Sequence, residues 1–220
     1  MTGADLGVPH PWGVQVTAGA VVPDPADAAA ALAWCRERGG DRGWVVSVPK
    51  SLSASAPWAD LATLETMGVY ATDAATAGDL DDGAPDDVEL VLHPTLDEVV
   101  EGYGGWMDDL PLAALLVTPE DLVHPDRRFV VARRDGSVVG SALVWWAGGT
   151  GYLSGIGVVE ALRGRGIGRA LTATAARIAA RGHDGSSPDV VWMHATPEGS
   201  ALYSRMGFAL VDTEVQLASP

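Results

Sequence analysis

The sequence is poor in cysteine and in long apolar runs, and each shortage excludes a class of protein. Cys35 is the only cysteine among 220 residues, so no disulfide can form within the chain, which fits a reducing compartment. No apolar run approaches the ~18 residues that a membrane-spanning helix needs. The N-terminus also lacks the basic and apolar regions of a signal peptide. We therefore expect a cytoplasmic protein with no membrane partner.

Basic side chains are scarce too. Arginine and lysine together number 14 against 29 acidic residues, Lys50 is the only lysine, and the formal net charge is −15. Such a surface repels a polyanion, so we expect no nucleic-acid partner. The excess of acid favours solubility and would also attract a cationic acceptor. With 47% hydrophobic residues, the chain can bury one sizeable core or two smaller ones.

An acidic stretch divides the chain. Residues 77–87 read A-G-D-L-D-D-G-A-P-D-D, which is typical of a linker or a long surface loop. It separates a first part, 1–76, from a second part, 88–220. The second part predicts an α/β fold with a hairpin at Asp135-Gly136. Its expected strands are 88–92, 129–133, 138–146, 152–159, 190–194 and 209–217, and its expected helices begin at 97, 119, 166 and 198.

The segment Leu162–Leu171, L-R-G-R-G-I-G-R-A-L, lies between an expected strand and the helix 166–181. Glycines let the backbone approach a ligand closely, and the first amides of a helix have no internal partner. With the helix dipole, these amides form a site for phosphate. The spacing differs from the dinucleotide fingerprint G-x-G-x-x-G, and the G-K-[ST] of a Walker loop is absent.

Two motifs carry a resemblance to a family. Arg163-x-x-Gly166-x-Gly168 fits [RQ]-x-x-G-x-[GA], and 201–208, A-L-Y-S-R-M-G-F, looks like A-L-Y-x-x-x-G-F. With 153–158, L-x-x-I-x-V, ahead of the first motif, residues 88–217 resemble the GCN5-related N-acetyltransferases (GNAT). The resemblance implies a mixed, mostly antiparallel sheet flanked by helices. It also implies acetyl-CoA as a cosubstrate, and because the glycine-rich loop occurs once, we expect one acetyl-CoA per chain.

The resemblance assigns cofactor contacts along the loop and the strand before it. The strand 152–159 would splay away from 190–194, leaving a gap for the pantetheine arm. Backbone groups there would orient the acyl carbonyl, and the loop would hold the pyrophosphate. The implied cofactor-binding residues are Val158, Val159, Arg163, Gly164, Arg165, Gly166, Gly168 and Arg169. We expect no metal site.

The resemblance also implies a catalytic centre. Tyr203 matches the family tyrosine that protonates the departing thiolate, although it could instead be a core tyrosine. His194, at a strand end, is our candidate base, with Glu160 second and a water relay as the alternative. Where many members carry an asparagine, this chain has Thr196, which puts one cofactor contact in doubt. The expected acceptor-site residues, a ring beside carboxylates, are Trp106, Asp108 and Asp109.

The first part predicts a second, degenerate copy of this architecture. We expect a helix at 25–38, a strand at 44–48, a helix at 57–67 and a strand from 68, the order found at the end of the second part. Glu65–Asp73 also parallels Ser204–Asp212. Residues 1–76 would then be a GNAT-like region that has lost its phosphate loop.

The expected function is acetyl transfer from acetyl-CoA to a small-molecule or peptide amine. Direct attack in a ternary complex is expected, because Cys35 lies outside the second part and no other thiol exists. Two other interpretations stay open: a non-catalytic CoA-binding regulatory module, and a protein-interaction domain. A homodimer also stays open.

Overall fold

The computed structural model describes residues 15–17, 33, 45–51, 53–54, 58–183 and 185–218. The chain forms two compact units, which are described separately. The smaller unit comprises Met1–Val69, Ala195–Ser200 and Leu210–Pro220, and the larger comprises Tyr70–His194 and Ala201–Ala209. Cys35 and most of the helix predicted at 25–38 lie outside the described residues. No helix in the described part of the chain is long and apolar enough to cross a membrane.

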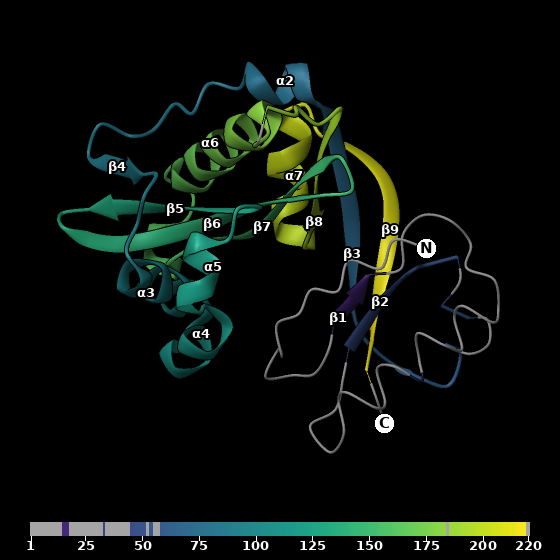
Figure 1. The fold of residues 1–220 in the computed structure, drawn as a ribbon. Helices are drawn as coiled ribbons and strands as arrows, with labels where there is room; N and C mark the ends of the chain where they lie inside the picture. The colour runs from purple at the N-terminus through teal and green to yellow at the C-terminus, as the bar shows by residue number, and fades with distance from the viewer. Residues whose placement is uncertain are drawn as a thin grey trace. The chain divides into compact units, whose positions relative to one another are not determined.

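The larger unit is built on a sheet in the order β3-β8-β7-β6-β5-β4 (Figure 1). Neighbours from β4 to β7 are antiparallel, whereas β7 and β8 are parallel. The mixed, mostly antiparallel sheet expected from the sequence is therefore confirmed. Its strands are β4 (Val88–Val91), β5 (Arg127–Arg134), β6 (Ser137–Ala147), β7 (Thr150–Val158), β8 (Val190–Ala195) and the end of β3 (Ala62–Asp73).

The hairpin between β5 and β6 is confirmed. Asp135 and Gly136 have φ values of 52° and 81°. Two central residues with positive φ give the turn whose twist matches the flanking strands, and Asp-Gly favours it. The local sequence therefore fixes this connection without help from distant contacts.

Helices cover both faces of the sheet in the larger unit (Figure 1). A Cβ on Gly102 of α3 would meet Ser141 on β6, and a Cβ on the neighbouring Gly140 would meet Leu171 of α6. Successive residues of a strand point to opposite faces, so α3 and α6 lie on opposite sides. The helices are α2 (Ala74–Gly78), α3 (Leu96–Met107), α4 (Leu110–Leu116), α5 (Pro119–Val123), α6 (Ile167–Arg181) and α7 (Pro197–Arg205).

Helix α6 packs closely on the sheet because its buried face is small. Ala175, Ala176 and Ala179 are completely buried there, and a Cβ on Gly151 of β7 would press on Ala179. The helix ends at Gly182, whose φ of 67° suits glycine. This close contact holds the C-terminal end of α6 against the start of β7.

The smaller unit has strands in the order β1-β2-β9-β3. β1 (Gln15–Thr17) is parallel to β2 (Val45–Pro49), and β2 is antiparallel to β9 (Ala209–Ala218). The strand predicted at 44–48 is confirmed. The helix predicted at 57–67 is wrong, because Ala62–Met67 belongs to the long strand β3. Strand pairing of β3 within the sheet decides the conformation of this segment.

Two observations bear on the predicted division of the chain. The larger unit begins at Tyr70, before the predicted linker, and it contains residues 79–87 as an irregular loop after α2. Asp82 of this loop pairs with Arg177 of α6 at 2.5 Å, so the loop is fastened to the larger unit. The predicted repeat in 1–76 relied partly on a helix at 57–67; the repeat stays a prediction.

Candidate active site

The glycine-rich loop turns β7 into α6. After a short 3-10 turn at Glu160–Leu162, Gly164 and Gly166 have φ values of 76° and 87°, and Gly166 is the N-cap of α6. The first bond of the helix is donated by Ala170 to the Gly166 carbonyl. In the described part of the chain, no backbone carbonyl accepts a bond from the six N–H groups of 164–169. N–H groups of this kind at a helix N-terminus can bind an anion.

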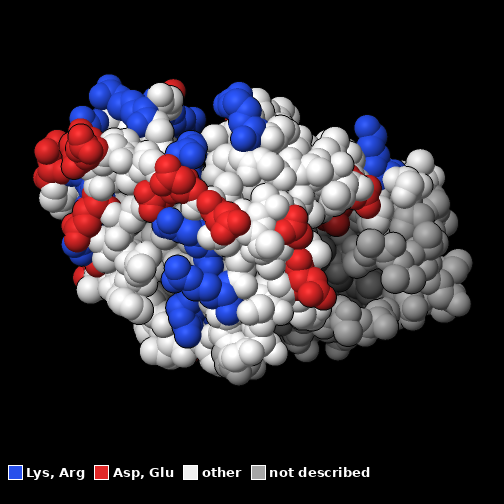
Figure 2. All heavy atoms as spheres, turned by 90° about the horizontal axis from the view of Figure 1, so that it is seen from above, with Lys and Arg blue, Asp and Glu red and all other residues white. Residues whose placement is uncertain are grey.

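Arginines surround this loop but are not all directed at it. Arg163 Nε donates to the Val158 carbonyl at 3.1 Å, and Arg169 Nη1 donates to the Asp82 carbonyl at 3.1 Å. Arg165 is exposed. Figure 2 shows basic side chains gathered beside acidic ones on the face seen from above. The loop therefore combines positive charge with a flanking carboxylate.

That carboxylate comes from the acidic loop 79–87. The pKa of Asp82 is lowered, first by its hydrogen bond with Arg177 and also by the charge of Arg169. A Cβ on Gly166 would lie 3.8 Å from Pro85, so the acidic loop runs beside the glycine turn. The sequence did not predict this contact, because it joins segments more than eighty residues apart.

The parallel strands β7 and β8 pair over only part of their length. Four pairs run from Thr150–Val190 to Leu153–Met193. Both strands continue beyond Leu153 and Met193, but no further pair joins them within the described residues. This end of the pairing is the divergence that the resemblance implied.

Backbone direction at the end of β7 distinguishes Val158 from Val159. The Val159 N–H donates to the Val139 carbonyl at 3.0 Å and so belongs to the sheet. Because backbone groups of successive residues in a strand point to opposite edges, those of Val158 point away from β6. Val158 therefore faces the side on which β7 and β8 have parted.

His194 lies in a cluster of half-buried rings. Its Nδ1 is 3.0 Å from the Tyr152 hydroxyl, and the Trp192 ring centroid lies 4.5 Å from that of Tyr152 and 5.4 Å from that of His194. His194 was predicted from the sequence, whereas Tyr152 and Trp192 were not. The spacing of Trp192 and His194 was a usable signal, since residues two apart in a strand share a face. The contact with Tyr152 depends on the register of β7 with β8, which the sequence does not give.

Tyr203 is buried between the rings of Tyr70 and Phe208, with centroids 6.3 and 6.4 Å away. Burial raises the pKa of the Tyr203 phenol further above neutral pH. Its surroundings are consistent both with a hydrogen-bond donor and with a core residue.

Sequence comparison decides the family of this part of the chain. Residues 125–210, which include β5 to α7, match the family model for the acetyltransferase (GNAT) domain. Residues 125–210 belong to the GNAT superfamily. No curated protein matches the sequence.

Solved structures agree with the GNAT fold. A GCN5-related N-acetyltransferase from Kribbella flavida is similar, with a TM-score of 0.67 and 23% identity over 94% of this chain and 81% of that one. A tandem GNAT protein from the clavulanic acid biosynthesis pathway has a TM-score of 0.62 and 17% identity, covering 97% and 75%. A GCN5-related N-acetyltransferase from Sphaerobacter thermophilus has a TM-score of 0.56 and 17% identity, covering 96% and 73%.

In this GNAT fold, Trp106 packs on the sheet. Its Nε1 donates to Ser141 Oγ at 2.9 Å, and a Cβ on Gly157 would overlap its ring. Asp109 caps α4 by accepting a bond from the Leu112 N–H at 2.9 Å, and Asp108 ends α3 with a φ of 57°. The structure therefore gives all three predicted acceptor residues a local structural role.

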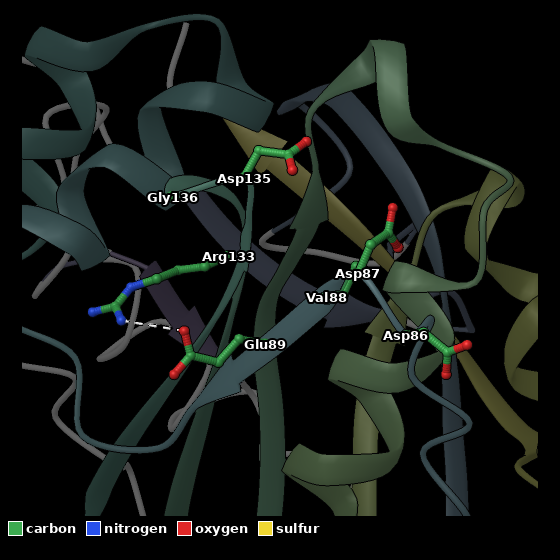
Figure 3. A pocket seen from close by; sticks show the side chains of 7 residues that line it. All are labelled: Asp86, Asp87, Val88, Glu89, Arg133, Asp135 and Gly136. Carbon is green, nitrogen blue, oxygen red and sulfur yellow. Dashed lines mark hydrogen bonds and ion pairs between the residues drawn. The ribbon is translucent and has the colours of Figure 1, made fainter.

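A hollow of about 290 Å³ lies elsewhere, at β4 and the β5–β6 turn. In Figure 3 its carboxylates do not converge on one point, and the glycine-rich loop does not line it. Among the residues that the structure describes, no group of three or more acidic, histidine or cysteine side chains could hold a metal. The lining residues are Asp86, Asp87, Val88, Glu89, Arg133, Asp135 and Gly136.

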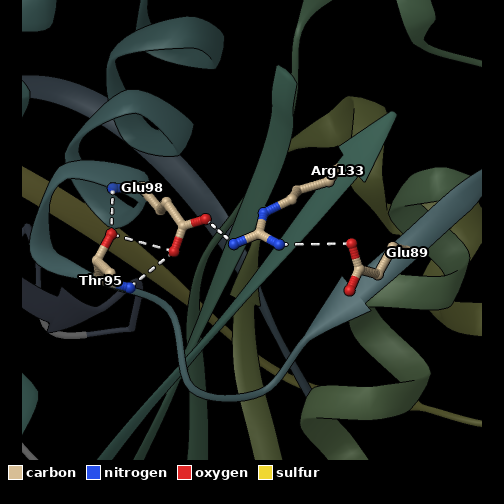
Figure 4. Close-up of polar contacts among 4 residues, drawn as sticks. All are labelled: Glu89, Thr95, Glu98 and Arg133. Atoms are coloured by element: carbon tan, nitrogen blue, oxygen red, sulfur yellow. Dashed lines mark hydrogen bonds and ion pairs between the residues drawn. The ribbon is translucent and has the colours of Figure 1, made fainter. Parts of the chain in front are cut away.

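One side of this hollow is a polar network that fastens α3 to β5. Arg133 pairs with Glu98 and, at 3.4 Å, with Glu89, while Glu98 and Thr95 form a capping box (Figure 4). The pKa of Glu98 is lowered, first by the Thr95 N–H and then by Arg133. These contacts hold α3 against β5. No residue of the glycine-rich loop lines the hollow, so we do not assign the hollow to the active site.

Proposed function

We propose that this chain transfers an acetyl group from acetyl-CoA to an amine. The observation that carries the proposal is the run of six amides, 164–169, at the start of α6. It directly follows a strand whose last residues have parted from their neighbour. An anion site beside an open strand backbone suits a ligand with a pyrophosphate and an extended amide-containing arm.

The residues present fit acetyl-CoA, which supplies the acyl group as an activated thioester. The amides of 164–169 would bind the pyrophosphate, with positive charge from Arg163, Arg165 and Arg169. The pantetheine arm would pair with the end of β7. The Val158 N–H, turned toward that side, would donate to the acyl carbonyl and stabilise the oxyanion as the amine attacks.

Proton movements are assigned to two side chains. His194 would accept the proton of the attacking amine, directly or through water. Its Nδ1 lies 3.0 Å from the Tyr152 hydroxyl, which would orient the ring. Tyr203, which carries its proton at neutral pH, would donate a hydrogen bond to the sulfur as the C–S bond breaks. Attack is direct, because the only cysteine, Cys35, lies outside the GNAT domain.

The acceptor is assigned only by class. The net charge of −15 favours a cationic amine, either a small molecule or a peptide. Trp106, Asp108 and Asp109 lie at the end of α3 and remain our proposed acceptor-side residues. Cytoplasmic location, a homodimer and a degenerate GNAT-like region at 1–76 also remain predictions.

Thiol release tests the proposed function. Purified protein is mixed with acetyl-CoA and a panel of polyamines, amino acids, aminoglycosides and peptides, and free thiol is measured with a chromogenic disulfide. We expect at least one amine to accelerate thiol release. If acetyl-CoA binds by calorimetry but no amine accelerates release, the chain is a non-catalytic CoA-binding module instead.

A further inference from the structure

β7 contains one extra residue relative to β6. This residue determines whether the Val158 N–H points toward β6 or toward the side where β7 and β8 have parted. Ser141 on β6 pairs with Gly157 and Leu143 pairs with Ser154, so two steps on β6 correspond to three on β7. This is a β-bulge at residues 155–156, and Gly155 has a φ of 57°. Without it, the register after residue 154 would shift by one and the Val158 N–H would turn into the sheet.

A chain of two hydrogen bonds ends on this bulge. Trp106 Nε1 donates to Ser141 Oγ at 2.9 Å, and Ser141 Oγ donates to the Gly155 carbonyl at 3.2 Å. Ser141 is completely buried, so its hydroxyl has little freedom to turn elsewhere. The chain therefore fixes the peptide plane at the residue with the unusual φ.

Packing from α3 supports the same segment. The Trp106 ring occupies the space of a Cβ on Gly157, and the Tyr103 hydroxyl occupies that of a Cβ on Gly155. The rings of Tyr103 and Trp106 also contact each other, with centroids 5.6 Å apart. Two glycines thus let α3 press directly on the bulged backbone.

We infer that Trp106 and Ser141 are positioning residues, which hold the bulge of β7 and so aim the Val158 N–H at the acyl carbonyl. This inference rests on the proposed function. It gives Trp106 a further role, exerted through Gly155 and Gly157, besides the acceptor-side position proposed above. Ser141, a small residue inside an ordinary strand, gave no signal in the sequence.

Calorimetry with two ligands separates this role from general stability. Acetyl-CoA has the acyl carbonyl and CoA lacks it, so the ratio of their Kd values reports the Val158 contact. We compare wild type, Trp106→Phe, Ser141→Ala and the double variant. Trp146→Phe is the matched control, because its indole donates one bond of the same length, 2.9 Å, to Ala179 on the α6 side.

We expect both single variants to keep CoA affinity within about twofold and to weaken acetyl-CoA binding by about threefold or more, which is the size of one lost hydrogen bond. The double variant should match Ser141→Ala, since both changes break one chain. Trp146→Phe should leave the ratio unchanged. Hydrogen exchange without ligand should accelerate at 155–158 in the two single variants but not in Trp146→Phe.

Three outcomes would overturn the inference. These are an unchanged Kd ratio in both single variants, an equal change in Trp146→Phe, or no faster exchange at 155–158. A wild-type protein that binds neither ligand overturns the proposed function instead. Binding of both ligands with an unchanged ratio removes only the role given to Trp106 and Ser141.

Discussion

Arg163 donates from Nε to the carbonyl oxygen of Val158 at 3.1 Å. The bond ties the start of the glycine-rich loop to the last residue of β7. Both backbone groups of Val158 point away from β6, so the guanidinium lies on the side where the strands part. Arg163 therefore has two proposed roles. Its charge favours phosphate binding, and its hydrogen bond links the proposed phosphate site to the proposed acyl site.

Gly166→Val should abolish acetyl-CoA binding. A β-branched residue strains a φ of 87°, and the strain moves the amides of the anion site. Gly136→Val is the control, with a φ of 81° and open space in the β5–β6 turn. Calorimetry should show lost affinity only in the first variant. If Gly166→Val bound acetyl-CoA as tightly as Gly136→Val, the loop would not be part of the binding site.

Tyr203→Phe should lower turnover more than it lowers acetyl-CoA affinity. The change removes the hydroxyl that we assign to the departing sulfur, while the ring still packs on Tyr70 and Phe208. Initial rates of thiol release and the Kd of acetyl-CoA give the comparison. Unchanged rates would make Tyr203 a core residue.

His194→Gln should lower the rate of acetyl transfer by about 100-fold if the imidazole is the base. Tyr152→Phe should have a smaller effect, because it removes the bond to His194 Nδ1 but keeps the imidazole and the ring contact with Trp192. His183→Gln is a matched control; that histidine packs on Trp146 and pairs with Asp126. A loss in His183→Gln as large as in His194→Gln would contradict the assignment.

Local signals explain what the sequence could predict. The Asp135-Gly136 turn and the start of α6 at Gly166 depend on backbone preferences of a few adjacent residues. The motifs therefore located the turn into α6 and the order of elements in the second part. The helix predicted at 57–67 failed because pairing within the sheet decided the conformation of Ala62–Met67.

The contacts that the sequence could not predict depend on how strands far apart in the chain are aligned. The contact between Tyr152 and His194 joins residues 42 positions apart and depends on the alignment of β7 with β8. Trp106 was assigned to the acceptor, whereas its described contacts are with Ser141 and Gly157. That contact lies beside the bulge of β7, for which Gly155 inside the strand was a usable local signal.

Asp82→Asn should tighten acetyl-CoA binding at low salt by a few-fold. The carboxylate lies among Arg169 and Arg177, so its removal leaves more positive charge beside the loop. The effect should shrink as salt rises. The lost ion pair is partly exposed and should cost at most about 1 kcal/mol of stability. Asp135→Asn, at the distant turn, should leave binding unchanged; weaker binding in Asp82→Asn would contradict this account.

In the Glu98→Gln variant, the free energy of unfolding should fall less steeply as the pH is lowered. The lowered pKa of Glu98 means that the folded protein resists its protonation, so this stabilisation is present above the unfolded pKa of about 4.3. It is lost as pH falls through the lower folded value. Denaturant unfolding from pH 7 to pH 3 measures the slope. Glu101 is exposed on the same helix, so it serves as the control. The free energy of unfolding of Glu101→Gln should fall with pH as steeply as that of wild type.

A titration of the ¹⁵N-labelled protein with acetyl-CoA, followed by amide NMR shifts, tests the central claim most directly. The account predicts saturable shifts concentrated at the amides of 164–169 and Val158, with one ligand bound per chain. Saturable binding that leaves those amides unmoved, or no binding at millimolar acetyl-CoA, would contradict it.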